Sequence, residues 1–334
     1  MTTSNNAWAI VLAGGEGSRL QGLTTDASGV TVPKQFCSLT GGQSLLAETL
    51  QRAASVVEPE RTCVVVGVQH RRWWEPMLSG MPKSNIIVQP SNRGTGNGVL
   101  LPLLHILVRD PNAHIVLLPS DHYVRDEPAL ASTLRLAVGA LEDQPDQVLL
   151  LGMHPNGADP DLGYIVPGYN TGPNISRVDR FVEKPSAAAA RQLLDQGALW
   201  NALIIASGAR ALLGLFMTRL PEVVAKMRCA VAEDLRCSPN ALATSIVYRD
   251  LPTIDFSSQI LQGAETELRL MEANRCGWSD LGTPKRLSET LRELPLIDET
   301  PRDSINSAFA PMNLSVQHAR FGSSILHASG SAGA

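Results

Sequence analysis

Short runs of apolar, often β-branched residues recur through the first half of the chain, separated by stretches with helical spacing. The runs predict strands at Ala7–Ala13, Thr62–Val68, Asn85–Val88, His114–Leu118 and Val148–Gly152. The stretches between them predict helices at Ser44–Ala54, Asn97–Val108 and Pro128–Leu141. Regular alternation of strands and helices predicts an α/β fold with a doubly wound, mostly parallel, Rossmann-like sheet.

The second half of the chain has a more mixed pattern. Strands are predicted at Tyr164–Val166 and Ser176–Val182, and a helix at Ser186–Gln196, with Ser186 as its N-cap. Further helices are predicted over Ala206–Arg236, broken at Pro221, and over Ile254–Gln262 and Pro284–Leu294. No repeat or long linker interrupts the chain. We therefore expect one domain over residues 1–295, with a smaller mixed half inserted at about 151–285 after a first half of about 1–150. Residues 296–334 would form a partly disordered tail, frayed over 322–334.

Composition and charge exclude several classes of protein. The 334 residues are 44% hydrophobic, which is ample for a sizeable core, and the net charge of −4 provides no general attraction for nucleic acid. The longest apolar stretch, Val99–Val108, is too short to cross a bilayer. Five scattered cysteines without a Cys-x-x-Cys pair argue against a zinc site and a disulfide scaffold. Residues 1–6 do not resemble a secretory signal, so we expect a cytoplasmic protein.

A glycine-rich loop directly follows the first predicted strand and is the most informative stretch of the chain. It reads Leu12-Ala13-Gly14-Gly15-Glu16-Gly17-Ser18-Arg19. Glycines let an anionic group approach the backbone N–H groups, and Arg19 adds forked donors suited to phosphate. The loop is not a P-loop, and Leu20 stands where a dinucleotide fingerprint needs its third glycine. It predicts a nucleotide phosphate site, with a sharp turn that binds no ligand as the alternative.

Two aspartates are candidate ligands for a divalent cation. Asp121 follows the predicted strand at His114–Leu118, and Asp280 lies between two glycines in Gly277–Gly282. Carboxylates at strand ends are suited to holding Mg²⁺ beside substrate phosphates. An N-cap or a surface ion pair is the alternative for each, and the sequence does not show whether the two meet.

Three further positions have a functional and a purely structural interpretation. Lys34 and Lys184 each lie beside a proline, in Pro33-Lys34-Gln35-Phe36 and Glu183-Lys184-Pro185, although solvated surface lysines are common. Gln89 opens the loop that runs to Gly96, and its amide carries the donor and acceptor that recognition of a base edge needs. A polar turn that starts a helix is the alternative for this loop.

Taken in order, these stretches resemble the sugar-nucleotide pyrophosphorylases. The resemblance covers roughly residues 7–285, and its Lys-Gln-Phe and Ser-Asp-His forms are similar to the mannose-1-phosphate guanylyltransferase branch. The motifs are Leu12–Leu20, Pro33-Lys34-Gln35-Phe36, Pro119-Ser120-Asp121-His122, Gly163-Tyr164-Ile165, Phe181-Val182-Glu183-Lys184-Pro185, Trp200-Asn201 and Trp278-Ser279-Asp280-Leu281-Gly282.

The resemblance implies a reaction and a role for each motif. A nucleoside triphosphate and a sugar-1-phosphate would form an NDP-sugar and pyrophosphate in a GT-A-like fold, with nucleotide and sugar-binding halves. GTP and mannose-1-phosphate are the implied substrates, and a homodimer is one arrangement that the resemblance allows. Arg19, Lys34, Asp121 and Asp280 would be catalytic, and Asp121 and Asp280 would hold Mg²⁺ or Mn²⁺. The nucleotide site would comprise Leu12, Ala13, Gly14, Gly15, Gly17, Ser18, Gln89, Gly94 and Thr95. The sugar-phosphate site would comprise Gly163, Glu183, Lys184, Asn201 and Asp255.

The chain departs from the family pattern at three places. Gln21-Gly22 stand where Trp-Pro is usual, and Asn92–Gly98 replaces Gly-Arg-Asn-Thr-Ala-Pro-Ala. Ala202-Leu203 replace Ser-Gly after Trp200-Asn201. These changes fall at expected base and sugar contacts, so they bear on substrate identity more than on reaction class.

The sequence leaves two rival functions open. One is a catalytically silent relative that senses an NDP-sugar, which the altered contacts favour but the retained Asp121, Asp280 and lysines oppose. The other is a nicotinamide-dependent oxidoreductase, which the missing third glycine disfavours.

Overall fold

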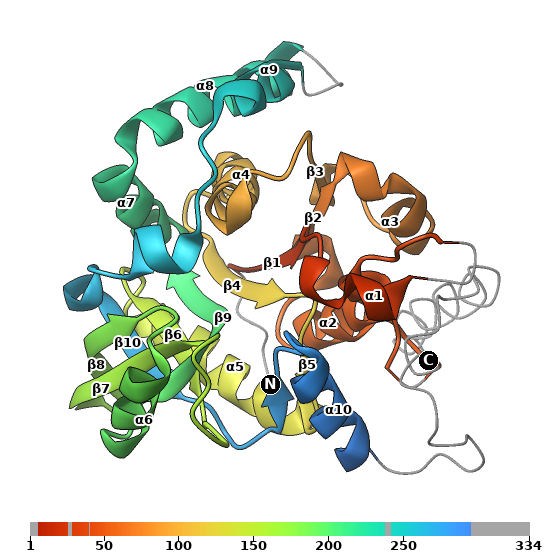
Figure 1. Cartoon of the computed structure of the whole chain (residues 1–334). Coiled ribbons are helices and arrows are strands. Elements are labelled where there is room, and N and C mark those ends of the chain that lie inside the picture. The colour runs from red at the N-terminus through yellow and green to blue at the C-terminus, as the bar shows by residue number, and fades with distance from the viewer. Residues whose placement is uncertain (1–5, 26–28, 40, 238–241, 295–334) are drawn as a thin grey trace, which may run out of the picture.

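The computed structural model describes residues 6–25, 29–39, 41–237 and 242–294, drawn in colour in Figure 1. One nine-stranded sheet runs through both halves of the chain. From one edge to the other its strands are β3 (Ile86–Gln89), β2 (Thr62–Gly67), β1 (Ala7–Ala13), β4 (His114–Pro119), β9 (Leu199–Gly208), β6 (Val148–Met153), β10 (Leu268–Glu272), β8 (Ile175–Val182) and β7 (Gly163–Gly172).

The sheet is mostly parallel. β3, β2, β1 and β4 pair in parallel, as do β6 and β10. β9 lies antiparallel between β4 and β6, and β8 is antiparallel to both β10 and β7, so all other strands run in one direction. A two-stranded ribbon of β5 (Tyr123–Val124) and β11 (Trp278–Ser279) joins segments far apart in the chain.

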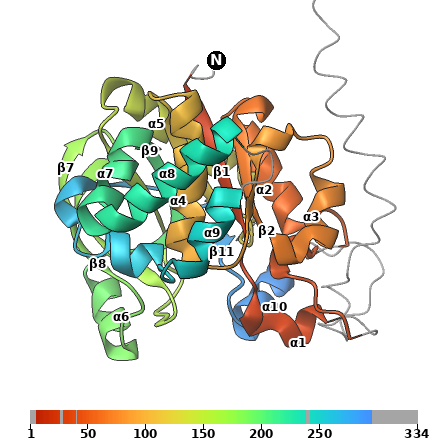
Figure 2. The same ribbon diagram turned by 90° about the horizontal axis from the view of Figure 1, so that it is seen from above.

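Helices cover both faces of the sheet, and each face has its own apolar core. The side chains of β1 alternate, with Ala9 and Val11 in one core and Trp8 and Ile10 in the other. Figures 1 and 2 show the two layers, with α4 on one side of the sheet and α2 on the other. The first core is covered by α2 (Leu45–Ala54), α3 (Arg71–Met77), α5 (Glu127–Asp143), α6 (Ala187–Asp195) and α10 (Pro284–Glu293). The second is covered by α4 (Gly94–Arg109), α7 (Ala209–Arg219), α8 (Pro221–Cys237) and α9 (Leu242–Asp250).

The predicted elements of the first half are confirmed to within a few residues, and β1 has the predicted bounds. Serine caps open two of the predicted helices. The hydroxyl of Ser44 accepts a hydrogen bond from the backbone N–H of Ala47 at 3.2 Å, before α2. The predicted cap Ser186 is confirmed, since its hydroxyl accepts a hydrogen bond from Ala189 at 3.2 Å, before α6. Each satisfies a backbone donor that a helix start leaves unpaired.

Several predictions for the second half were wrong. The helix predicted from Ala206 begins at Ala209, because Ala206 to Gly208 complete strand β9. Most residues of β9 are buried, so the strand lacks the alternation by which an exposed strand is recognised. The break at Pro221 is confirmed, whereas the helix predicted over Ile254–Gln262 is reduced to a π-helical turn, Ser257–Leu261. Strands β9 and β10 and helix α9 were not predicted, and neither was helix α3 in the first half.

The proposed tail, residues 296–334, lies outside the described residues. No helix in the described ranges is both long enough and apolar enough to cross a membrane.

Candidate active site

The site is built where the carboxyl ends of parallel strands meet, which is where ligands bind in open α/β sheets. Leu12 of β1 pairs with Pro119 of β4, so the glycine loop and Asp121 emerge side by side. Ser120 fixes this junction, because its backbone N–H and its hydroxyl both donate to the carbonyl of Leu12, at 3.1 and 2.7 Å. Segments about a hundred residues apart in the sequence thus meet at the carboxyl edge of the sheet.

The glycine loop is held from two sides. The side-chain amide of Gln35 donates to the carbonyls of Ala13 and Gly15, at 3.0 and 2.9 Å. On the other side, Glu16 accepts a hydrogen bond from Gln69 at 2.7 Å and lies 3.3 Å from the Nε2 of His70. The sequence predicted a loop that cradles an anion, and these contacts fix its shape in advance of any ligand.

Glycine is required at one end of this loop. Gly17 has a φ of +60°, and a Cβ at this position would lie 3.2 Å from the backbone nitrogen and the Cβ of Lys34. This conformation and this close approach both favour a residue without a side chain. The loop and the segment that carries Lys34 therefore pack directly against each other.

Lys34 joins three segments that are distant in the sequence. Its side chain is buried, with 5% of the residue exposed. The ammonium donates to the backbone carbonyl of Asp280 at 2.7 Å and lies 3.0 Å from the Oδ2 of Asp121. The two candidate metal-binding segments therefore meet at one ammonium group beside the glycine loop.

The carboxylate of Asp121 is open on one side, with a side-chain exposure of 40%. Burial raises the pKa of this carboxyl, but Lys34 and His122 outweigh that effect and hold the pKa below its ordinary value. Burial lowers the pKa of His122 to about 4. The neutral ring accepts a hydrogen bond at Nδ1 from the indole of Trp278, at 3.2 Å, which leaves the proton on Nε2, 3.6 Å from Asp121.

Asp280 is held quite differently from Asp121. Its carboxylate is buried and faces the guanidinium of Arg286, with Nε 2.7 Å from Oδ1 and Nη2 donating to Oδ2 at 3.0 Å. The backbone N–H of Gly282 donates to Oδ1 at 3.1 Å. A Cβ on Gly282 would lie 2.3 Å from Oδ2 and 2.6 Å from Nη2 of Arg286, so a larger residue would displace one of these two groups.

Asp121 and Asp280 fit a hard divalent cation by the chemistry of their donors. Mg²⁺ prefers carboxylate oxygens and commonly uses one or two of them together with substrate phosphates. In the described part of the chain no cluster of three or more His, Cys, Asp or Glu could hold a metal by itself. Asp121 has an accessible carboxylate, whereas Asp280 shares its own with Arg286.

Gln89 lies close to the glycine loop, as expected for a nucleotide site. It is buried at the end of β3, and its Oε1 would be 2.7 Å from a Cβ on Gly14. Its Nε2 donates to the hydroxyl of Tyr248 at 3.1 Å. One of its amide donors is therefore already committed, and its acceptor oxygen faces the loop.

Gly94 and Thr95 are tied to a later segment of the chain. Gly94 has a φ of +81°, and a Cβ there would lie 2.3 Å from the carbonyl oxygen of Ile254. The hydroxyl of Thr95 accepts a hydrogen bond from the backbone N–H of Phe256 at 2.8 Å. Gly94 and Thr95 therefore have a structural role in packing against this segment, in addition to the contact with the base that is expected from the sequence.

The predicted sugar-phosphate residues converge at the edge of β7 and β9. A Cβ on Gly163 would lie 2.5 Å from the Oε2 of Glu183 and 3.2 Å from the Cβ of Asn201. Asn201 donates to the hydroxyl of Ser257 at 3.2 Å, and Asp255 lies near enough to Glu183 to affect its pKa. Burial raises the pKa of Glu183 above its ordinary value, although Lys184 opposes the shift.

Lys184 projects beside this group. Its ammonium lies 3.1 Å from Glu183, its side chain is 54% exposed, and its φ is +46°. Leu203 and Leu281 also have positive φ angles, of 55° and 51°. Such strain in non-glycine residues is most often found at ligand sites. Here Leu203 follows Asn201 by two positions, and Leu281 follows Asp280 directly.

The structure does not bring Arg19 into this network. Arg19 is exposed, and it forms no hydrogen bond or ion pair with any residue in the described ranges. The side chain of Ser18 lies outside what the structure describes. The backbone positions Leu12, Ala13, Gly15 and Gly17 lie in or next to the loop as expected.

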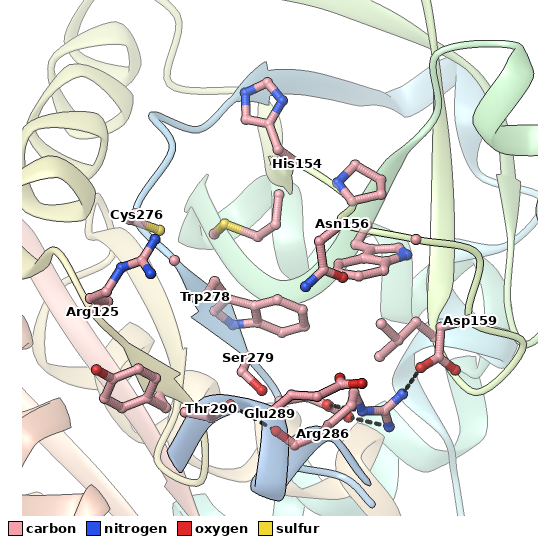
Figure 3. Close-up of a pocket in the computed structure, with 18 of the residues that line it drawn as sticks. Arg125, His154, Asn156, Asp159, Cys276, Trp278, Ser279, Arg286, Glu289 and Thr290 are labelled. Carbon is pink, nitrogen blue, oxygen red and sulfur yellow. Dashed lines mark hydrogen bonds and ion pairs between the residues drawn. The ribbon is translucent and has the colours of Figure 1, made fainter. Parts of the chain in front are cut away.

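Several residues of the site were not singled out from the sequence. Gln35 and His122 lie inside the quoted motifs, so the motifs held the signal for them. Tyr248 and Arg286 lie on helices with ordinary amphipathic patterns and gave no local signal. Arg286 also lines a cavity of about 800 Å³ between α10, β11 and the segment that links β6 to β7 (Figure 3).

Comparison with known proteins is consistent with this geometry. A family model described as "Nucleotidyl transferase" matches residues 8–295. The xanthan biosynthesis protein XanB of Xanthomonas campestris pv. campestris (strain B100) is 32% identical over 222 residues, which are 66% of this chain and 43% of that protein. A mannose-1-phosphate guanylyltransferase of Salmonella montevideo is 29% identical over 298 residues, covering 84% of this chain and 59% of the relative.

A solved structure supports the same relationship. The crystal structure of "mannose-1-phosphate geranyltransferase" from Thermus thermophilus superposes with a TM-score of 0.73 at 29% identity, over 87% of this chain and 80% of that one. The chain spans about half the length of the curated relatives that it matches. Because the family model covers most of the chain, the chain belongs to the nucleotidyl transferase family.

Proposed function

We propose that the chain is a sugar-1-phosphate nucleotidyltransferase, and more specifically a mannose-1-phosphate guanylyltransferase. A phosphate oxygen of the sugar-1-phosphate attacks the α-phosphorus of GTP. The bond between the α-phosphorus and the bridging oxygen breaks, and pyrophosphate leaves with the electron pair. GDP-mannose is the second product. The single observation that carries the proposal is the ammonium of Lys34, which contacts both Asp121 and the backbone of Asp280 beside the glycine loop.

The chemistry needs little proton transfer, since the attacking phosphate oxygen is already an anion. Catalysis then depends on positioning and on neutralising charge as pyrophosphate departs. Lys34 supplies a buried positive charge, and the backbone amides of Gly14, Gly15 and Gly17 supply donors at the triphosphate. Arg19 is exposed beside the same loop, where it would meet the outer phosphates.

Asp121 and Asp280 would hold Mg²⁺ or Mn²⁺. When bound, the cation would neutralise phosphate charge and orient the triphosphate. The protein's own contribution is to keep Asp121 ionised, which Lys34 does by lowering the pKa of its carboxyl.

The two substrates would be bound by two separate groups of residues. Gln89, Gly94 and Thr95 support the base, with Tyr248 fixing the orientation of the Gln89 amide. Gly163, Glu183, Asn201 and Asp255 surround the sugar, and Lys184 is free to reach its phosphate because its side chain is exposed. The names of the relatives from Salmonella montevideo and Thermus thermophilus support mannose-1-phosphate as the sugar substrate.

The decisive experiment is pyrophosphate release with each of five nucleoside triphosphates against a panel of sugar-1-phosphates, with Mg²⁺ present. Release with GTP and α-D-mannose-1-phosphate above all other pairs supports the proposal. Tight binding of an NDP-sugar without any turnover would instead establish the silent sensor. Hydride transfer with a nicotinamide cofactor would establish the oxidoreductase.

A further inference from the structure

Arg286 joins two acidic side chains from different parts of the chain. Its guanidinium pairs with Asp280, as described above, and also forms an ion pair with Asp159, between β6 and β7 (Figure 3). Arg286 and Asp280 are 9% and 8% exposed, so both charges are largely removed from water. We call Arg286, Asp280 and Asp159 the Arg286 clamp.

The clamp and Gly282 use part of the binding capacity of Asp280. A carboxylate has about four acceptor positions. Nη2 of Arg286 and the N–H of Gly282 each donate to one of its oxygens, and Nε of Arg286 lies 2.7 Å from Oδ1 as an ion-pair contact. The guanidinium also neutralises the negative charge that would attract a cation. A divalent ion that approaches Asp280 therefore competes with Arg286 for the same oxygens.

The other arm of the clamp connects to the residues proposed to bind the sugar phosphate. Asp159 lies in a turn that the hydroxyl of Tyr164 closes. This hydroxyl accepts from the backbone N–H of Asp159 at 2.8 Å and donates to its carbonyl at 3.1 Å. Tyr164 is fully buried and directly follows Gly163, which pairs with Asn201 between β7 and β9 and leaves room for the carboxylate of Glu183. Contacts therefore run without interruption from the sugar-phosphate residues through Asp159 and Arg286 to Asp280.

We propose that Arg286 is a positioning residue that competes with the divalent cation for the Asp280 carboxylate, and that Asp159 moderates this competition by sharing the guanidinium. This inference rests on the proposed function, because it assumes that Asp280 is a metal ligand. Removing Arg286 leaves a buried carboxylate without its ion-pair partner, and Lys34 contacts the backbone of Asp280 rather than its carboxylate, so the cation binds more tightly. Removing the charge of Asp159 leaves Asp280 as the sole partner of Arg286, so the cation binds more weakly.

The test is binding of Mn²⁺ alone, without substrates, followed by electron paramagnetic resonance and calorimetry on the whole chain. We expect Arg286→Gln to lower the Kd for Mn²⁺ by at least ~10-fold, as fits the loss of a buried counter-ion. We expect Asp159→Asn to raise the Kd by roughly threefold, because its charge is partly exposed and its effect is correspondingly screened.

Arg125→Gln is the matched control. Arg125 lines the same cavity and pairs with Glu293 at 2.8 Å, so its replacement removes a guanidinium from the cavity without touching Asp280. We expect the Kd of this variant to stay within roughly twofold of the original chain, since the pair that it breaks is exposed. Melting curves establish that each variant is folded.

Opposite shifts in Arg286→Gln and Asp159→Asn support the inference. An unchanged or raised Kd in folded Arg286→Gln overturns it. If Arg286→Gln does not fold, Asp159→Asn decides alone, and an unchanged Kd there overturns the inference. Asp121→Asn distinguishes failure of the proposed metal site from failure of the proposed competition at Asp280. If Mn²⁺ binding does not depend on Asp121, the proposed metal site fails, and the competition at Asp280 fails with it.

Discussion

The two candidate lysines differ in burial and in partners, and those differences assign them different roles. Lys34 is buried and fixed by two oxygens, at 2.7 and 3.0 Å, so its charge is already in place when the triphosphate binds. A fixed charge in a site shielded from water acts mainly on the charge that develops in the transition state. Lys184 is half-exposed with a single carboxylate partner, Glu183, and is suited to gripping a substrate phosphate.

Lys34→Met should therefore lower kcat by at least ~10²-fold, whereas Lys184→Ala should chiefly raise the KM for the sugar-1-phosphate. Steady-state kinetics of pyrophosphate release measures both effects, and a melting curve checks that Lys34→Met folds. If the two variants show the same relative changes in kcat and in KM, Lys34 and Lys184 do not have the different roles assigned to them here.

Asp121 provides the second prediction at this scale. Its carboxylate is the more accessible of the two candidate ligands, so Asp121→Asn should lower kcat by at least ~10²-fold if the metal supplies several kcal/mol of charge stabilisation. Asp126→Asn is a useful comparison, because Asp126 caps α5 through the N–H of Ala129 at 2.9 Å and takes no part in the crevice. Turnover of Asp121→Asn at the level of Asp126→Asn would remove Asp121 from the mechanism.

At the scale of elements, the sequence predicted best those features whose strand residues and turn residues are adjacent in the chain. The glycine loop after β1 was predicted with its neighbouring strand because an apolar run and a glycine turn are adjacent in the chain. The Arg286 clamp could not be found in this way, since nothing within α10 itself marks Arg286 as a partner of Asp159. The same holds for β9, which is a largely buried strand inside the second half and lacks an alternating pattern, and for β10, which has only five residues.

The N-terminus of α4 gives a prediction about backbone geometry. Gly94 has a φ of +81° and no room for a Cβ beside Ile254, so Gly94→Ala should destabilise the fold by about 1–3 kcal/mol. Gly139 lies inside α5, where a Cβ would meet no atom within 4 Å. Gly139→Ala should therefore stabilise by about 0.5–1 kcal/mol, because alanine favours a helix. Chemical denaturation measures both values, and equal effects at the two glycines would refute the argument.

Helix α2 carries a group whose titration should affect stability. Burial raises the pKa of Glu48 to about 7, against the effect of Arg52 and with a smaller contribution from Glu127. The folded chain then binds a proton more tightly than the unfolded chain does. The resulting stabilisation is complete below about pH 4.5 and is lost as the pH rises through 7.

Glu48→Gln removes this dependence, because glutamine is neutral throughout. Relative to the original chain, the variant should gain about 1–2 kcal/mol of unfolding free energy between pH 5 and pH 8, allowing for partial exposure of the carboxyl. Denaturation at both pH values tests this. A difference between the two proteins that does not change with pH would show that Glu48 titrates normally.

At the scale of the whole molecule, the residues of the proposed base site come from segments that are brought together only by the fold. Gly14 follows β1, Gln89 ends β3, Gly94 begins α4 and Tyr248 comes from α9. Tyr248 takes one amide donor of Gln89, so the Oε1 of Gln89 is the atom that remains to accept a hydrogen bond beside Gly14. In the proposed function, the choice of base would therefore depend on contacts that no single motif contains.

Guanine presents N1–H and N2–H donors side by side, which suits an acceptor held in a fixed orientation. A base that mismatches this edge leaves a buried polar group unpaired, at a cost of about 1–3 kcal/mol. We therefore expect kcat/KM with GTP to exceed that with ATP, UTP, CTP or dTTP by at least ~10-fold, measured with α-D-mannose-1-phosphate. Tyr248→Phe removes the hydrogen bond that orients the Gln89 amide, so the amide can rotate. This variant should have a smaller ratio of kcat/KM with GTP to kcat/KM with the other triphosphates, while the KM for the sugar-1-phosphate stays unchanged. A clear preference for UTP or dTTP would retain the nucleotidyl transfer but remove the guanylyl assignment, and with it the strongest argument for mannose.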